Sequence, residues 1–218
     1  MAQIESIRVP GIDEALKLGD WVHSALRSAV NFSTGEITGD DILFNYQVGG
    51  TVSGGGAGTA SKYHTNMPDT GKLPSPMEAL IYFMSIVLPP SIGATTAQTG
   101  VGGTSAVGDA NDIAENVTWE LRIGASKKVY DDGNLDRFPG GGGIAGFSAL
   151  YGQSAATDRT TVTNGVPGAG AKQPYAIPHS IGSLEVFDVQ ATVTTTLALA
   201  ANTTVRVYLE GLIRRTIS

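Results

Sequence analysis

The sequence predicts an all-β protein of the sandwich type, and three observations support this. The stretch 184–213 alternates apolar with polar residues twice in succession, which puts one set of side chains on a buried face and the other in water. Gly is abundant, at 29 of 218 residues, while charged residues make up only 16%; this combination suits many strands joined by turns and long loops. Other short segments are rich in β-branched and aromatic residues, as a half-buried pleated surface prefers.

The alternation is clearest in the last third of the chain. The residues expected to face inward are Phe187, Val189, Ala191 and Val193, and then Val205, Val207 and Leu209. The residues expected to face water are Asp188, Gln190, Thr192 and Thr194, and then Arg206, Tyr208 and Glu210. Ala200–Thr203 is the expected turn between the two strands. An amphipathic helix over Thr194–Ala201 is the alternative, which the run of three threonines disfavours.

This pattern implies unequal costs of truncation. If Phe187 is a core residue, Phe187→Ala should cost about 3–5 kcal/mol. Asp188→Ala or Gln190→Ala should cost less than about 1 kcal/mol, unless these side chains contact another subunit.

The N-terminal part of the chain is expected to be helical. Over residues Ile12–Val30, apolar side chains recur at roughly helical spacing with polar ones between them, although Gly19 weakens the pattern. The chain therefore divides into an N-terminal arm or short helix, residues 1–36, and a sandwich domain, residues 37–218. Whether the helix docks on a neighbouring molecule or closes one end of its own sandwich is left open.

The middle of the chain adds further strands, for a total of seven or eight. They are Asp41–Gly49, Glu78–Leu88, Thr118–Ile123 continued by Lys127–Tyr130, then Leu135–Phe138 and Tyr175–Ile181. Glu78–Leu88 is apolar on both parities, as a strand buried on both sides or a buried helix would be; flanking prolines and β-branched residues favour the strand. Asp131–Asn134 has the composition of a turn, and Asp109–Asn116 that of one or two helical turns.

Three loops of low complexity separate these segments. They are Gly50–Ser61, Ser91–Gly108 and Gly165–Lys172. The first two, at Gly50–Ala60 and Ala94–Gly108, are expected at the surface near subunit boundaries, where Gly-rich backbone adapts at low steric cost. Eight strands in two sheets with large loop insertions describe a single jelly roll, which is the fold we expect.

Charge and composition exclude several classes of function. The net charge is −6, which disfavours a general nucleic-acid-binding surface. There is no Cys, so neither disulfides nor thiolate metal sites can form. The first residues have no basic start followed by an apolar core, so a signal peptide is not expected. The most apolar run, Ala79–Leu88, is much shorter than the ~20 residues of a transmembrane helix.

The sequence contains no convincing nucleotide-binding or nucleophile motif. Gly141, Gly143 and Gly146 formally match G-x-G-x-x-G, but the run follows a proline and no acidic residue stands about 20 positions on. A loop that needs close backbone approach is the simpler interpretation. Ser148 lacks the second glycine of G-x-S-x-G, so the nucleophile elbow is not met.

Metal-ligating patterns are similarly weak. His23, His64 and His179 are scattered and have no zinc-type spacing. The oxygen-rich run Asp131, Asp132, Asn134 and Asp136 offers Ca²⁺ ligands without EF-hand spacing, and a solvated turn is the simpler reading. Arg214-Arg215 is either a solvated chain end or a contact with a neighbour or an anionic lipid. The sequence therefore assigns no catalytic, cofactor-binding or metal residue, and we expect no enzyme and no cofactor.

Three segments together resemble a known family. They are Thr65–Leu88, Leu121–Gly152 and Tyr175–Ser218, about two thirds of the chain. The layout is Thr65-Asn66 and Leu73-Pro74 before a core strand, a short strand followed by Gly-rich sequence, and a last strand reading V-x-V-x-L-x-G-x-x-x-R from Val205. This layout resembles jelly-roll virion proteins of icosahedral bacterial and archaeal viruses, including tailless phages with an internal membrane.

The resemblance implies a structural role in a virion. The expected protein is a capsid protein, most simply the major one, that self-assembles into an icosahedral shell. Its expected partners are copies of itself, other virion proteins and an internal viral membrane, without sequence-specific nucleic-acid binding. The expected location is the virion, after synthesis in the host cytoplasm. A carbohydrate-binding jelly-roll module at a vertex or host-contact position is the alternative, and the small number of clustered aromatic residues argues against it.

Overall fold

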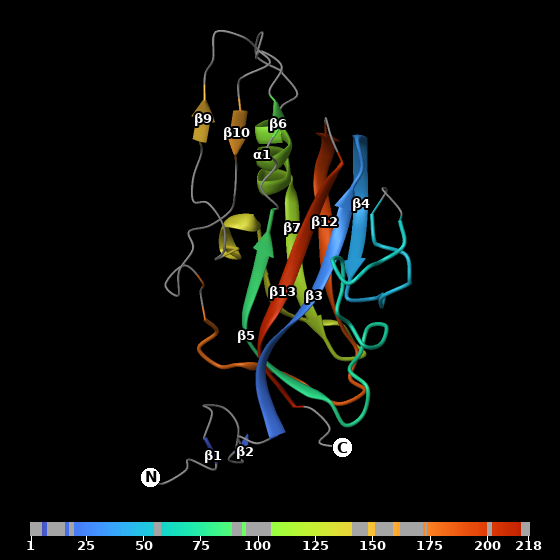
Figure 1. Cartoon of the computed structure of the whole chain (residues 1–218), viewed down its shortest axis with the longest axis vertical. Coiled ribbons are helices and arrows are strands. Elements are labelled where there is room, and N and C mark those ends of the chain that lie inside the picture. Colours follow the sequence, from blue (N-terminus) through green and yellow to red (C-terminus); the bar gives the residue numbers. More distant parts are fainter. Residues whose placement is uncertain are drawn as a thin grey trace.

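Two antiparallel four-stranded sheets form the body of the molecule (Figure 1). The computed structural model describes residues 6–7, 16–17, 20–54, 58–88, 93–94, 106–140, 148–150, 159–161, 172, 174–199 and 202–214. The strands of the two sheets are β3 (Trp21–Phe32), β4 (Gly35–Leu43), β5 (Glu78–Val87), β7 (Val117–Ile123), β8 (Lys128–Gly133), β11 (His179–Ile181), β12 (Phe187–Leu199) and β13 (Thr203–Arg214). The prediction of an all-β sandwich is confirmed.

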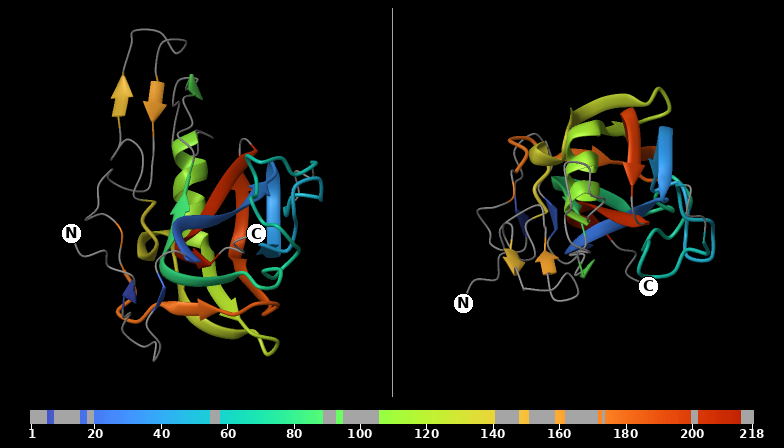
Figure 2. Two further views of the ribbon diagram at one scale, coloured as in Figure 1. Left: turned by 60° about the horizontal axis from the view of Figure 1, so that its bottom comes forward. Right: turned by 90° about the horizontal axis from the view of Figure 1, so that it is seen from above.

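Smaller elements accompany the sheets. They are β1 (Ser6–Ile7) paired with β2 (Leu16–Lys17), a set of β6 (Gly93–Ala94), β10 (Arg159–Thr161) and β9 (Ser148–Leu150), the helix α1 (Ala106–Asn116), and a 3-10 turn at Leu135–Arg137. The predicted helical turns at 109–116 thus belong to α1. Ile113 of α1 is fully buried in the core, and Figure 2 shows the helix at one flank of the sandwich.

The strands pair in a nested order. The sheet nearer the viewer in Figure 1, here called the front sheet, has the order β11-β5-β13-β3, and the rear sheet has the order β4-β12-β7-β8. Taken along the chain, the first of these strands pairs with the last, β3 with β13, and the second with the second-last, β4 with β12. The third, β5, pairs with the sixth, β11, and the fourth and fifth, β7 and β8, pair as a hairpin. Every pairing is antiparallel.

A single apolar core fills the space between the sheets. Phe32 of the front sheet meets Trp119 of the rear sheet edge to face, with ring centroids 6.4 Å apart. Phe44 packs on Phe187 at 5.7 Å. All four rings are buried, and burying such rings supplies much of the stability of a sandwich.

The two C-terminal strands have the predicted faces but lie in opposite sheets. Phe187, Val189, Val205 and Val207 are all buried, as the alternation predicted. β12 belongs to the rear sheet and β13 to the front sheet, so the turn between them crosses from one layer to the other. No helix forms over 194–199, which continues β12.

The prediction of an N-terminal helix is wrong where the structure describes this part of the chain. Residues 21–32, which the predicted division assigned to an arm, form β3 and pair with β13 along their whole length. Leu26, Val30 and Phe32 point into the core. Residues four positions apart lie on the same side of a strand and also on the same side of a helix. The spacing of Leu26 and Val30 therefore fits a strand as well as a helix. Most of residues 1–19 lie outside the described residues.

Four local predictions also need correction. The strand predicted at 41–49 ends at Leu43, because Phe44 takes a left-handed conformation with φ 64° while its ring stays buried. Lys127–Tyr130 does not continue the preceding strand. The chain reverses at Gly124 (φ 87°) and Lys127 (φ 51°), and Lys128–Gly133 returns as β8. The predicted turn at 131–134 therefore falls largely within a strand. The strand predicted at Leu135–Phe138 is wrong, because residues 135–137 form a 3-10 turn.

The predicted loop at 50–61 is more ordered than its composition suggested. Val52 and Ala60 are buried with Tyr46 in a small cluster of their own. Gly49 N donates to Ala60 O at 2.7 Å, and Ala60 N donates to Gly50 O at 2.7 Å, so the described part folds back as a small hairpin. Most of the other two predicted loops, and the Gly-rich run 141–147, lie outside the described residues.

Side chains and backbone groups between Tyr46 and Asn66 cover the free edge of β3. Asn66 Oδ1 accepts from Arg27 N at 2.6 Å, and Asn66 Nδ2 donates to Ala25 O at 2.7 Å, so one amide side chain replaces a neighbouring strand. Ala29 N donates to Tyr46 Oη at 3.0 Å. Asn31 N donates to Ser53 O at 2.9 Å. An edge occupied in this way is unavailable to a strand from another molecule.

Among the described residues there is no helix long and apolar enough to cross a membrane.

Candidate interaction surface

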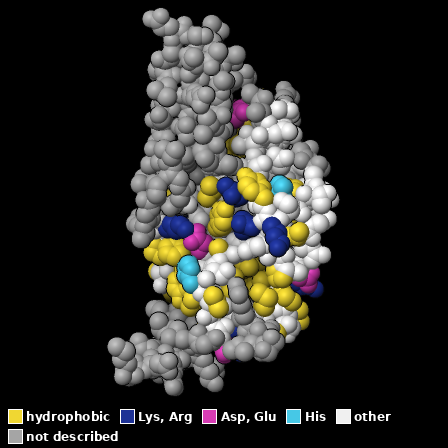
Figure 3. Space-filling view, viewed as in Figure 1, with side chains coloured by type: hydrophobic (Ala, Val, Ile, Leu, Met, Phe, Trp, Pro, Cys, Tyr) yellow, Lys and Arg dark blue, Asp and Glu magenta, His cyan; other side chains and the backbone are white. Residues whose placement is uncertain are grey.

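The outer face of the front sheet is the most distinctive surface that the structure describes (Figure 3). Residues directly opposite one another on paired strands project to the same side. The register places Arg27 beside Tyr208 and Arg206 beside Ala29, while Leu80 lies beside Leu212. These positions alternate with the buried Val205, Val207 and Leu209, so they belong to the outer side of the sheet.

The lower part of this face is apolar. Leu80 is only 3% exposed, and the partly buried side chains of Trp21, Tyr82 and Leu212 pack against it. Burial raises the pKa of the Tyr82 hydroxyl. We call these four residues the outer apolar cluster. An apolar group on the solvent side of a sheet is typical of a surface that meets another molecule.

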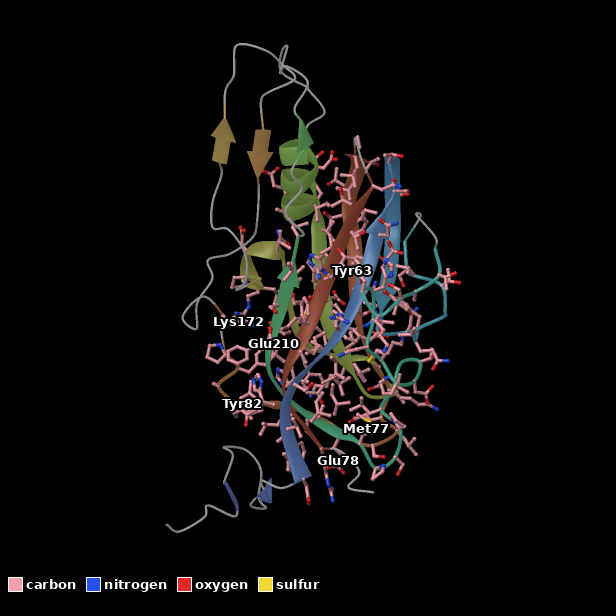
Figure 4. All side chains as sticks on the ribbon, viewed as in Figure 1. Tyr63, Met77, Glu78, Tyr82, Lys172 and Glu210 are labelled. Carbon is pink, nitrogen blue, oxygen red and sulfur yellow. The ribbon has the colours of Figure 1, made fainter. Side chains whose placement is uncertain are left out.

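The middle of the face holds the part-buried carboxylate of Glu210. Ser85 is 1% exposed and its Oγ donates to Glu210 Oε1 at 3.0 Å. Lys172 Nζ forms an ion pair with the same carboxylate oxygen. Figure 4 shows Lys172 beside Glu210, with Tyr82 below them and Tyr63 above. The carboxylate of Glu210 is therefore satisfied within the chain.

The upper part of the face carries a basic cluster, defined as Arg27, Lys62 and Arg206 with the ring of Tyr63. The Arg206 guanidinium lies over the Tyr63 ring, 4.8 Å from its centroid. Arg27 Nη2 donates to the backbone carbonyl of Lys62. The Nε atoms of both arginines are buried without a hydrogen-bond partner. Figure 3 shows Lys and Arg side chains gathered over β13 and β3.

A second group of polar and aromatic residues joins the two sheets at their other edge. The His179 ring lies 4.3 Å from Tyr175 and 5.2 Å from Tyr130, measured between centroids. Asp131 forms an ion pair with Arg137 at 3.3 Å. Burial lowers the pKa of His179, and the charge of Asp131 opposes this. Burial, and then the charge of Asp131, raise the pKa of Tyr175 well above its usual range. This group connects β8 to β11.

The histidines singled out by sequence have different surroundings. His23 is exposed on β3, and His64 Nδ1 is 3.1 Å from Ser61 Oγ. His179 lies in the group just described. Within the part of the chain that the structure describes, no group of three or more His, Asp or Glu residues is placed to hold a metal ion.

The remaining candidates are only partly described. Gly141, Gly143 and Gly146 lie outside the described residues, as does Arg215. Only the backbone of Ser148 is described, as part of β9. Arg214 Nη1 lies 3.4 Å from Glu78 Oε2, so it is an internal ion pair on the front sheet.

Sequence reasoning did not find the outer apolar cluster or the basic cluster. Their members come from β3, β5, β13 and the segment after the small hairpin, and no local pattern links these parts. The outward parity of Arg206 was predicted correctly, but Tyr63 is brought to it only by the chain that seals the edge of β3.

No protein-family model, no curated protein and no solved structure matches this chain.

Proposed function

We propose that this chain is a structural virion protein built on a single jelly roll, and that it self-assembles into an icosahedral shell as the major capsid protein. The nested strand order carries this proposal. A jelly roll is a hairpin of strand pairs wrapped into two four-stranded sheets, so its first strand pairs with its last and each inner pair follows. The pairs β3–β13, β4–β12, β5–β11 and β7–β8 have this order.

The segments that resemble jelly-roll virion proteins have structural roles that fit the proposal. Asn66, in the first segment, seals the edge of β3. The last segment supplies β11, β12 and β13. Gly211, the glycine of the V-x-V-x-L-x-G pattern, stands where a Cβ would come 1.8 Å from Leu80 O, so this position accepts only glycine without a shift of the strands.

The outer apolar cluster favours an assembled protein, because a contact between copies would bury it. Trp21, Tyr82 and Leu212 lie on the outer side of a sheet whose other side already faces the core. Burying apolar area is worth about 25 cal/mol per Å², so a copy that covers these side chains gains stability that the monomer lacks. The covered edge of β3 is one place where such contacts cannot form by strand addition.

A carbohydrate-binding module has one feature in its favour. Tyr130 is 43% exposed and stands next to His179 and Tyr175, and exposed rings stack on sugars. The outer apolar cluster has no role in that alternative, so we place it second.

Assembly of the purified chain tests the proposal. The wild-type protein should form particles by sedimentation and electron microscopy, and Leu212→Asp should prevent this because it buries a charge in the contact. Val48→Asp is the control, because Val48 is 46% exposed and lies outside the cluster; it should assemble as the wild type does. A wild-type chain that stays monomeric at all concentrations, or a Leu212→Asp variant that assembles normally, would contradict the proposal.

A further inference from the structure

The cations of this chain divide into paired and unpaired ones. Among the described side chains, those with a carboxylate partner are Lys72, Arg122, Lys127, Arg137, Lys172 and Arg214. The described cations without one are Arg27, Lys62, Arg206 and Lys128. The first three form the basic cluster. In an acidic chain of net charge −6, the unpaired cations are thus concentrated at one place on the front sheet.

Two carboxylates without a described cation partner stand side by side on the outer face of the rear sheet. Glu120 of β7 stands directly opposite Asp132 of β8, and on its other side it pairs with the uncharged Gln190 of β12. Trp119 and Leu121, on either side of Glu120, are buried, so Glu120 projects from the outer face. Asp132 is exposed. Neither carboxylate has a cation within ion-pair distance among the described side chains.

Both arrangements are unfavourable in an isolated molecule. Like charges placed opposite each other across two strands destabilise a sheet. Arg27 of β3 pairs with Tyr208 and Arg206 of β13 pairs with Ala29, so the two arginines stand diagonally on one face and their charges repel each other over a longer distance. A surface of opposite charge relieves either repulsion. Since the basic cluster and the Glu120–Asp132 pair have opposite charges and lie on opposite faces, the complement of each patch is present on every other copy of the chain.

We infer that the basic cluster of one copy binds the Glu120–Asp132 pair of a second copy, so that sandwiches associate front face to rear face. This inference rests on the proposed self-assembly and names the surfaces that make one of its contacts. Such a contact is heterologous, because two different patches meet, and it therefore extends from copy to copy until a ring closes. Arginine suits it because its planar fork binds carboxylates with two hydrogen bonds.

A charge exchange between the two faces tests the inference. Lys62→Glu/Arg206→Glu makes both faces acidic, and Glu120→Lys/Asp132→Lys makes both basic. Each variant alone should associate at least about tenfold more weakly than the wild type, a factor that corresponds to about 1.4 kcal/mol. The two variants mixed in equal amounts should recover association, because each acidic face then meets a basic one. Sedimentation velocity at low and high salt measures this, and wild-type association should weaken as salt screens the contact.

The controls separate this inference from the proposal beneath it. Lys128→Glu reverses an unpaired cation outside the basic cluster, and because Lys128 lies on β8 with Asp132 it adds negative charge to the rear face, so it should associate at least as strongly as the wild type. Circular dichroism confirms that each variant is folded; for any that is not, the single changes Lys62→Glu and Asp132→Lys, both at exposed positions, replace the double ones. If the wild type assembles but both charge variants do so equally well, or the mixture fails to recover, the face-to-face contact is wrong while self-assembly stands. If the wild type never associates, the proposed function itself fails.

Discussion

At the scale of single residues, the alternation of apolar and polar residues predicted which way each side chain points but not what it contacts. Asp188 was expected in water because its neighbours Phe187 and Val189 point inward. It does point outward, yet it is only 5% exposed, because Arg122 Nε lies 2.6 Å and Lys127 Nζ 2.9 Å from its two carboxylate oxygens. Arg122 belongs to another strand, and nothing in the local sequence pairs it with Asp188. The prediction that truncating Asp188 costs little therefore overlooked this ion-pair cluster.

Asp188→Ala should cost about 3 kcal/mol, since removing one partner of a buried pair leaves the other charge uncompensated. Arg122 would be that charge, as its side chain is 12% exposed and its Nη2 atom is already buried without a partner. Gln190→Ala is the matched control two residues along the same face, and it should cost less than about 1 kcal/mol. Urea unfolding of both variants measures the difference. If both variants lose less than about 1 kcal/mol of unfolding free energy, water solvates the Arg122 guanidinium once Asp188 is removed, and the ion pair contributes little.

The inward residues were predictable for a physical reason. Phe187, Val189, Val205 and Val207 follow strict period two, and only one register of a half-buried strand buries all of them. Phe44 was not predictable in the same way, because its buried ring depends on a left-handed backbone at the end of β4. Side-chain pattern encodes the faces of regular strands and says little about the turns at their ends.

At the scale of elements, strand existence was easier to predict than strand extent and pairing. β5, β7, β12 and β13 were all expected close to their observed bounds. β3 was taken for a helix because its partner, β13, is far away in sequence and its apolar spacing also fits a helical period. The seal along the edge of β3 was not predicted at all, since it depends on one asparagine side chain reaching two backbone groups.

Gly211 gives a test of the strand pairing itself. The register of β13 with β5 shifts between Glu210 and Gly211, and here a Cβ on Gly211 would lie 1.8 Å from Leu80 O. Gly211→Ala must therefore push two central strands of the front sheet apart, and we expect a loss of about 3 kcal/mol or more. Gly58→Ala is the control, because no atom lies within 4 Å of its Cβ position. It should change stability by less than about 0.5 kcal/mol. Thermal unfolding compares the two, and a stable Gly211→Ala protein would show that the sheet is paired differently.

At the scale of the whole molecule, the nested order makes each half of the chain depend on the other. β3 and β4 come from the first fifth of the chain, and their partners β13 and β12 come from the last. No contiguous half contains a complete sheet. Periodicity could predict the strands and their faces, but the order of pairing depends on contacts between residues far apart in sequence, which local patterns do not encode. The placement of the basic cluster and the Glu120–Asp132 pair on opposite faces is likewise a property of the folded sandwich.

This interdependence predicts that the sandwich unfolds in one cooperative step. Trp119 reports on the contact between the sheets, since it is fully buried on β7 and packs against Phe32 of β3. The chain has two Trp residues, so Trp21→Phe leaves Trp119 as the sole indole probe; because Trp21 lies in the outer apolar cluster, the core is unchanged. In urea, Trp119 fluorescence and the far-ultraviolet circular dichroism of the strands should change with the same midpoint, as two-state unfolding requires. A fluorescence change at lower urea would mean that the sheets separate while each remains folded, which strand pairs drawn from both ends of the chain should not allow.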